Sequence, residues 1–416
     1  MVHHLRVGSL IVLACVCARG QPQPVTSAAA PPDALSRGIN GEEDRVQAAK
    51  AKAEEARGRN THYKTRWDLS FLPEYRPSGR VAGTLRIWGL GTLASGELAK
   101  DWEEEFRRYH PEATFEWHLP TAVAGMSSLI TGAGDLGAFD KLPLSEARAF
   151  QRLYSRDPVE LPLATGAFDV PGWASALGVF VNPDNPLARI SIGQLDGVFG
   201  AARSGGWVGT SWHTELGRGA DQDIRSWGQL GLTGAWADMP IDVHGPEPRS
   251  EESLQFADAV LRGGDKWSER LHLYSDRLGP DGRLILASEQ IAEALAQDRY
   301  GLAYFANLKT QARVKPLAVA EQSAGAAVPL TIDTVQDRTY PLCLTEHWYL
   351  NPNPGQPLDP RVREFLRYVL SREGQGQVER DGKYLPLTPE LVEAGLEKIN
   401  QGTPSNAHTL APHPAP

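Results

Sequence analysis

Residues 84–139 decide the fold class, and they read TLRIWGLGTLASGELAKDWEEEFRRYHPEATFEWHLPTAVAGMSSLITGAGDLGAF. The stretch begins with an alternating segment, residues 84–89, in which Leu85 and Ile87 lie on one face, as is typical of a strand. An apolar stripe at near-helical spacing follows, formed by Leu98, Trp102, Phe106 and Tyr109. We therefore expect a strand that leads through a glycine turn into an amphipathic helix.

The remainder of this stretch repeats the alternation of strand and helix. Residues 114–119 alternate again, residues 129–130 are typical of a helix, and residues 136–139 form a short apolar strand. A β-α-β-α-β order of this kind predicts a doubly wound α/β sheet.

Two apolar strands farther along the chain predict a second domain between them. We expect residues 176–181 to cross into it and residues 301–305 to cross back. A strand at residues 240–243 and helices at residues 250–262 and 291–295 are expected in between.

The chain accordingly divides into an export signal, a linker region, two lobes and a tail. The predicted boundaries are residues 1–20 for the signal peptide, 21–80 for a tether, charged spacer and clasp, 81–175 plus 308–399 for lobe I, 176–307 for lobe II, and 400–416 for a disordered tail.

The N-terminus has the pattern of an export signal. Arg6 precedes the short apolar run of residues 7–14, which is too short to span a bilayer as a helix. Two processing routes are open. Residues 12–15, VLAC, are similar to a lipobox with Cys15 as the lipidated residue, whereas residues 18–20 suit ordinary signal peptidase. Either route predicts a periplasmic or other extracytoplasmic protein, lipid-anchored in the first case.

Charge and cysteine content exclude several classes of function. The formal net charge is −9, which is unfavourable for general binding to nucleic acid or to an anionic membrane surface. The three cysteines are Cys15, Cys17 and Cys343, and two of them lie in the export signal, so no disulfide framework is expected. No spacing of cysteine and histidine indicates zinc, and we expect neither a metal nor a cofactor.

Motifs that carry chemistry are also missing, so we expect a protein that is not an enzyme. The chain contains no G-x-S-x-G elbow, no H-E-x-x-H pair and no Walker A lysine. Gly89 and Gly91 are followed next by Gly96, which breaks dinucleotide-binding spacing. With Ser95 as helix cap and Thr92 just before the first turn, this turn is interpreted either as a site that attracts an anion through backbone N–H groups or as a plain N-cap that faces solvent.

Several stretches together resemble the phosphate-binding-protein family of type II periplasmic binding proteins. They run in order over residues 81–387, about three quarters of the chain. The segments are YHP at 109–111, LITGAGDLG at 129–137, NPDNPL at 182–187, QLDGVF at 194–199, SWG at 226–228, YPL at 340–342 and FLRYVLSREGQ at 365–375.

This resemblance implies two α/β lobes joined by a two-stranded hinge. It further implies a monomer that captures a small anionic solute, phosphate or another oxyanion, between the lobes. The closed form is then expected to dock on an ABC permease in the inner membrane. Backbone N–H groups, hydroxyls, an arginine and a carboxylate hold the anion in such proteins.

The four loops that the resemblance assigns to the ligand depart from the family pattern. They offer Thr92 in the first loop, residues 121–125 in the second, Asp140 in the third, and Arg249 with Ser250 in the fourth. In the fourth loop, Glu251 and Glu252 stand where the family has glycine and threonine. Two carboxylates beside an anion pocket oppose binding, and we therefore expect phosphate to bind weakly or not at all.

Two other functions stay open at this point. A periplasmic sensor or scaffold that keeps the fold with a degenerate ligand site is one, and the charged spacer favours it. A hydrolase on the same architecture is the other, and the missing nucleophile argues against it. A permease and an ATPase encoded beside the gene would favour uptake over sensing.

The first testable prediction concerns export. Cell fractionation is expected to find the mature protein outside the cytoplasm. If Cys15 is lipidated, labelled palmitate is incorporated and the Cys15→Ser variant loses the label. A mature protein that stays in the cytoplasm would contradict the prediction, whereas export without label identifies the soluble form.

Overall fold

The computed structural model describes residues 34–307 and 313–401, and in residues 34–40 it describes the backbone only. The predicted signal peptide, with Cys15, and nearly all of the predicted tail lie outside the described residues. The chain divides into two compact units, Met1–Arg45 and Val46–Pro416. The described part of the first unit is helical and belongs to α1 (Ala34–Gly58).

The first of two five-stranded sheets has the order β2-β1-β3-β16-β4. Strands β1, β2 and β3 are parallel, whereas β16 runs antiparallel between β3 and β4. The strands are β1 (Gly83–Gly89), β2 (Ala113–His118), β3 (Leu136–Phe139), β4 (Val159–Thr165) and β16 (Thr345–Leu350). Strand, helix and strand therefore alternate through the N-terminal part of this sheet, as the sequence predicts.

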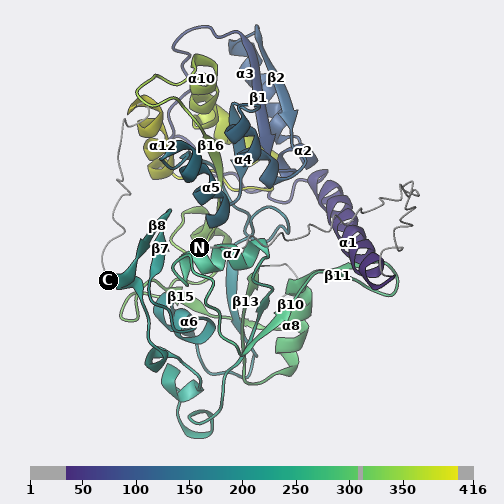
Figure 1. Ribbon diagram of the computed structural model, residues 1–416, viewed down its shortest axis with the longest axis vertical. Coiled ribbons are helices and arrows are strands. Elements are labelled where there is room, and N and C mark those ends of the chain that lie inside the picture. Colours follow the sequence, from purple (N-terminus) through teal and green to yellow (C-terminus); the bar gives the residue numbers. More distant parts are fainter. Residues whose placement is uncertain (1–33, 308–312, 402–416) are drawn as a thin grey trace, which may run out of the picture. The chain divides into compact units, whose positions relative to one another are not determined.

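Helices cover this sheet because their apolar faces match it. In α3, Leu98, Trp102 and Phe106 are all fully buried, and the helix lies alongside β1 and β2 (Figure 1). Trp102 also donates its ring N–H to the carbonyl oxygen of Gly374 at 2.9 Å. The helices of this part are α2 (Thr92–Ser95), α3 (Leu98–Tyr109), α4 (Ala122–Thr131), α5 (Leu144–Tyr154), α10 (Pro360–Val369), α11 (Arg372–Asp381) and α12 (Pro389–Gln401).

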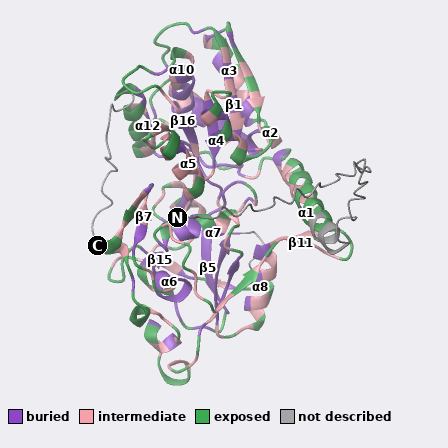
Figure 2. Ribbon diagram, viewed as in Figure 1, coloured by how far each residue is buried: buried purple, intermediate pink, exposed green. Residues whose placement is uncertain are grey.

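The second sheet has the order β10-β9-β13-β5-β14. Its strands are β5 (Leu177–Val181), β9 (Asp242–Pro246), β10 (Leu271–Tyr274), β13 (Gly301–Ala306) and β14 (Lys315–Pro316). Its helices are α6 (Ile192–Phe199), α7 (Glu251–Ala259) and α8 (Ala287–Gln297), and the short helix α9 (Ile332–Gln336) follows later in the chain. Strands β5 and β13 are buried along their whole length, which explains their unbroken apolar sequences (Figure 2).

Short elements complete this part of the chain. They are the pairs β6 (Arg189–Ser191) with β15 (Ala318–Ala320), β7 (Gly206–Val208) with β8 (Ser211–His213), and β11 (Arg277–Leu278) with β12 (Leu284–Ile285), and the 3-10 helices η1 (Thr214–Leu216), η2 (Ala220–Gln222), η3 (Trp227–Leu230) and η4 (Gly234–Trp236).

Three local details differ from the sequence expectations. Helix α7 ends at Ala259 rather than at residue 262, where Arg262 has a left-handed φ of 56°. The strand expected at residues 240–243 is β9, which begins later, at Asp242. Strand β14 pairs with β5, so residues 315–316 belong to the second sheet, although the sequence analysis grouped residues 308–399 with the first lobe.

A glycine is required where β1 meets β3. Gly89 has a φ of 137°, and a Cβ atom at this position would lie 2.1 Å from the carbonyl oxygen of Ala138. The close approach lets Leu90 donate its backbone N–H to the same oxygen at 3.2 Å. Only glycine satisfies both the φ angle and the space.

We predict that Gly89→Ala lowers the free energy of unfolding by roughly 2–4 kcal/mol, since the new side chain adds backbone strain and a clash with β3. Urea denaturation measures the loss. Gly79→Ala is the matched control, because no atom lies within 4 Å of a Cβ placed there. Equal stability of the two variants would show that β1 and β3 adjust freely.

Candidate functional site

The turn after β1 is built differently from the expected anion-binding turn. Helix α2 has only four residues, its N-cap is Gly91 without a side-chain cap, and it therefore has little dipole to offer an anion. Ser95 lies at the end of α2, where its hydroxyl donates to the carbonyl oxygen of Gly91 at 3.1 Å. The prediction that Ser95 caps the start of a helix was wrong, because the chain begins a helical turn before it.

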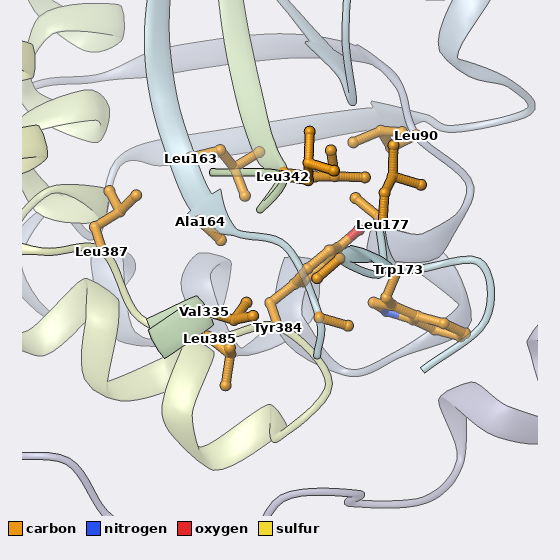
Figure 3. Packing of buried hydrophobic residues seen from close by; sticks show 14 of the residues in the cluster. Leu90, Leu163, Ala164, Trp173, Leu177, Val335, Leu342, Tyr384, Leu385 and Leu387 are labelled. Carbon is orange, nitrogen blue, oxygen red and sulfur yellow. The ribbon is translucent and has the colours of Figure 1, made fainter. Parts of the chain in front are cut away.

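Thr92 points into the protein and already has a partner. It is buried, and its hydroxyl shares a hydrogen bond of 2.7 Å with the hydroxyl of Tyr384. The Tyr384 ring packs in an apolar cluster that includes Leu177 and Leu342 (Figure 3). Burial, followed by the nearby charges of Glu346 and Asp140, raises the pKa of Tyr384 well above its ordinary value, so this phenol stays protonated.

Glu346 continues this chain of polar groups and was not anticipated from the sequence. It lies on β16, is fully buried, and neither carboxylate oxygen has a partner at standard hydrogen-bond geometry. Burial raises the pKa of Glu346 to about 7, with the charge of Glu251 adding to the rise and the polar side chains of Asp140 and Tyr384 opposing it. The sequence signal for it is a carboxylate between Leu344 and Trp348, at the buried positions of an alternating strand.

Asp140 lies beside Glu346, directly after β3. Its position is fixed by its own backbone, because His347 on β16 donates a ring N–H to the carbonyl oxygen of Asp140 at 2.8 Å. Burial, and then the charge of Glu346, raise the pKa of Asp140 well above its ordinary value. A side-chain hydrogen bond with Glu251 acts in the opposite direction.

Glu251 brings a third carboxyl group from the second sheet. It occupies the first turn of α7, where Ser250 is the N-cap and accepts a hydrogen bond from the backbone N–H of Ser253 at 3.2 Å. Glu251 as a whole residue is exposed, but the protein around its carboxyl group displaces water from it. This desolvation, followed by the charges of Asp140 and Glu252, raises the pKa of Glu251 well above its ordinary value. We refer to Asp140, Glu251 and Glu346 as the acidic cluster.

The four residues predicted from the sequence are thus only partly brought together. Thr92 and Asp140 join through Tyr384 and Glu346, and Ser250 holds the helix that carries Glu251. Arg249 is exposed and forms no ion pair within the described part of the chain. Glu251, which the sequence analysis places in the fourth loop, is exposed, and its carboxyl group interacts electrostatically with Asp140.

The acidic cluster can hold protons or attract a positively charged group. Each of the three carboxyl groups raises the pKa of another member, so the cluster holds protons more tightly than isolated carboxyl groups do. Among the described residues, no group of three or more histidine, cysteine, aspartate or glutamate side chains is arranged to hold a metal ion. Within the same ranges, no helix has the length and apolar character needed to cross a membrane.

Comparison with known proteins matches residues 75–373 to the model of the PBP superfamily domain. The phosphate-binding protein PstS of Pseudomonas aeruginosa is 30% identical over 329 residues, 79% of this chain and 90% of that protein. Protein SphX of Synechococcus elongatus is 23% identical over 247 residues, 58% of this chain and 59% of that protein. The crystal structure of a possible phosphate binding protein from Planctomyces limnophilus covers 77% of this chain and 99% of its own, at 18% identity and a TM-score of 0.44.

We predict that Glu346 makes stability depend on pH. The pKa of Glu346 is about 7 in the folded state and about 4.5 in the unfolded state, so the folded state binds this proton more tightly. The free energy of unfolding therefore falls as pH rises from about 4.5 through about 7. The full effect corresponds to roughly 3 kcal/mol. Glu346→Gln is therefore expected to flatten this decline in the free energy of unfolding, measured by urea denaturation between pH 5 and pH 8.

The measurement compares how steeply the free energy of unfolding changes with pH, because the amide of Glu346→Gln also changes the absolute stability. Glu393→Gln, an exposed position on α12, is the control and should keep the slope of the unmodified protein. A Glu346→Gln variant with an unchanged slope would assign the proton to another group.

Proposed function

Because the chain belongs to the PBP superfamily and, within it, to the family of the phosphate-binding protein PstS, we propose that it is the substrate-binding component of an ABC importer. Its fold is that of a type II periplasmic binding protein, and its role is to bind a solute. The relative PstS carries the name of a binding protein, which supports a function without catalysis. We place it outside the cytoplasm, as a monomer that delivers its solute to a permease in the inner membrane.

The two sheets support an assignment of two lobes. One lobe contains the sheet with β1 and β16, and the other contains the sheet with β5 and β13. The pairing of β14 with β5 favours a return to the first lobe somewhat later in the chain than residue 308. The hinge then consists of the segments that join the two sheets, before Leu177 and after β14.

The proposed ligand site lies where the loops after β1, β3 and β9 meet. It contains Thr92, Asp140 and Ser250 from the sequence prediction, together with Tyr384 and the other members of the acidic cluster. Arg249 is proposed as the residue that meets an anionic group, because it is exposed and free of an ion pair in the described ranges. The single observation that carries the site is the ion pair of Lys141, which follows Asp140, with Asp258 of α7 at 3.2 Å, because it brings the end of β3 beside the helix that begins with Glu251.

The charge of this site determines which solutes fit. One like charge at about 4 Å costs on the order of 4 kcal/mol at the effective dielectric near a protein surface, or about three decades of affinity. An oxyanion is therefore expected to bind only when the carboxyl groups are protonated. A protonated carboxyl group can donate a hydrogen bond to an anion, whereas an ionised one only accepts. We expect binding of phosphate to be weak or absent near neutral pH.

A second candidate function is a sensor or scaffold that does not transport a solute. The observation in its favour is that Thr92, the hydroxyl offered by the first loop, is already bonded to Tyr384. A site whose polar groups are satisfied by one another has fewer donors left for a ligand. Binding measurements separate the two functions, because an importer component needs a solute and a scaffold does not.

We predict that Glu251→Gln binds phosphate or sulfate at least about tenfold more tightly than the unmodified protein at pH 7.5, because it removes a like charge from the site. Titration calorimetry measures both. Sulfate is the better probe of pH, since its charge is constant between pH 5 and pH 8. Its affinity for the unmodified protein should rise as pH falls and the acidic cluster takes up protons.

Glu247→Gln makes the same change in net charge in the same exposed loop and should have a much smaller effect. Micromolar or tighter binding of phosphate by the unmodified protein at pH 7.5 would overturn the electrostatic argument. In that case Arg249→Ala should weaken binding sharply, and an unchanged affinity would remove Arg249 from the site.

A further inference from the structure

The second half of α1, residues 46–58, presents charged side chains along one face. Lys50, Glu54 and Arg57 recur at a spacing of four and three residues, which places them above one another on a helix. All three are partly buried, whereas Lys52 and Glu55 on other faces are exposed. The buried face of the helix is therefore mixed, because these charged side chains alternate with Val46, Ala49 and Ala53.

Lys50 ties this helix to the part of the chain that contains the second sheet. Its ammonium group lies 2.9 Å from a carboxylate oxygen of Asp276, which lies between β10 and β11. Burial opposes the charge on Lys50, but Asp276, Glu252 and Glu251 together raise its pKa above the ordinary value. The positive charge of Lys50 thus faces the carboxylates at the start of α7.

The end of α1 is tied to the part that contains the first sheet. A Cβ atom on Gly58 would lie 1.8 Å from the carbonyl oxygen of Ser95, so the helix end touches the backbone of α2. The chain then continues along the C-terminus of α11, where the backbone N–H groups of His62 and Tyr63 donate to the carbonyl oxygen of Gly382 at 3.0 and 2.8 Å.

We propose that residues 46–58 form an intramolecular strap that joins the two sheet-containing parts beside the acidic cluster. Lys50 anchors the strap on one side, and Gly58 anchors it on the other. The strap depends only on the contacts of the chain, so it stands independently of the proposed function.

Glu54 extends the strap toward the acidic cluster. Its side chain lies against Gly172, where a Cβ atom would meet Glu54 Cγ at 3.1 Å. Its charge is among those that raise the pKa of Asp140, and Lys50 and Arg57 act on Glu54 in turn. The strap therefore alternates positive and negative charges along the same region in which carboxyl groups from both sheets meet.

Further contacts join the same two parts, among them the hydrogen bond that the Thr210 hydroxyl donates to a carboxylate oxygen of Asp157 at 2.7 Å, and the experiment has to take them into account. Lys141 forms an ion pair with Asp258 at 3.2 Å, and Arg148 donates to the backbone oxygen of Thr210 at 3.0 Å. Removal of the Arg148 contact by Arg148→Ala gives a background in which the strap has a larger share of the connection.

The test compares Lys50→Glu with Lys52→Glu, which makes the same change of charge on an exposed face of the same helix. In the Arg148→Ala background and without ligand, small-angle X-ray scattering is expected to give a larger radius of gyration for Lys50→Glu. Hydrogen exchange of the full chain should show about tenfold lower protection of the amides of residues 46–58 in Lys50→Glu alone, because the new carboxylate faces Asp276 and Glu252.

Equal radii of gyration for the two variants would overturn the proposal, because the helix would then not hold the two sheet-containing parts together. Equal loss of protection in both variants would overturn it as well, since the effect would reflect helix stability in general. If the double variants fail to fold, the hydrogen-exchange comparison of the single variants decides. None of these measurements uses a solute, so failure of the proposed function leaves them unaffected.

Discussion

Strand β16 lies between β3 and β4, and this pairing determines how the rest of the chain is organised. It joins residues about 200 positions apart, because His347 pairs with Phe139. The chain must therefore leave the first sheet after β4, form the second sheet, and return to complete the first. The same pairing places Glu346 and His347 beside Asp140. The first sheet and the acidic cluster consequently depend on one strand of six residues.

The acidic cluster follows from this geometry and from the burial that comes with it. Glu346 occupies a strand position whose neighbours, Leu344 and Trp348, are buried, so its carboxyl group has little water to stabilise a charge. Asp140 directly follows the adjacent strand, β3, and Glu251 is the first residue of α7, a helix that contacts the second sheet. Each of the three is an ordinary residue in its own segment. Their common property is that each makes ionisation of the others less favourable.

The sequence was informative about the elements and less so about the site. The order of β1, α3, β2, α4 and β3 was readable because strand and helix periodicity alternate cleanly there, and the family resemblance gave the architecture of both halves. Thr92 and Asp140 were proposed from the family resemblance, which assigns the loops that contain them to the ligand. Glu346 and Tyr384 were missed, since nothing in a sequence shows that a strand near residue 346 inserts next to residue 139. The role of Lys50 was hidden for the same reason, because its partner Asp276 is more than 200 residues away.

The arrangement of the two sheets has a consequence for the order in which the protein folds. All strands of the second sheet lie between residues 177 and 316, so it can form from a continuous stretch of chain. The first sheet has to close a much longer loop before β16 can pair, and such distant contacts slow folding. Until then β3 and β4 each have an edge with unpaired backbone groups, and open edges of this kind favour aggregation. The chain from residue 345 onward therefore protects the N-terminal strands from intermolecular pairing, and truncation before this residue would remove that protection.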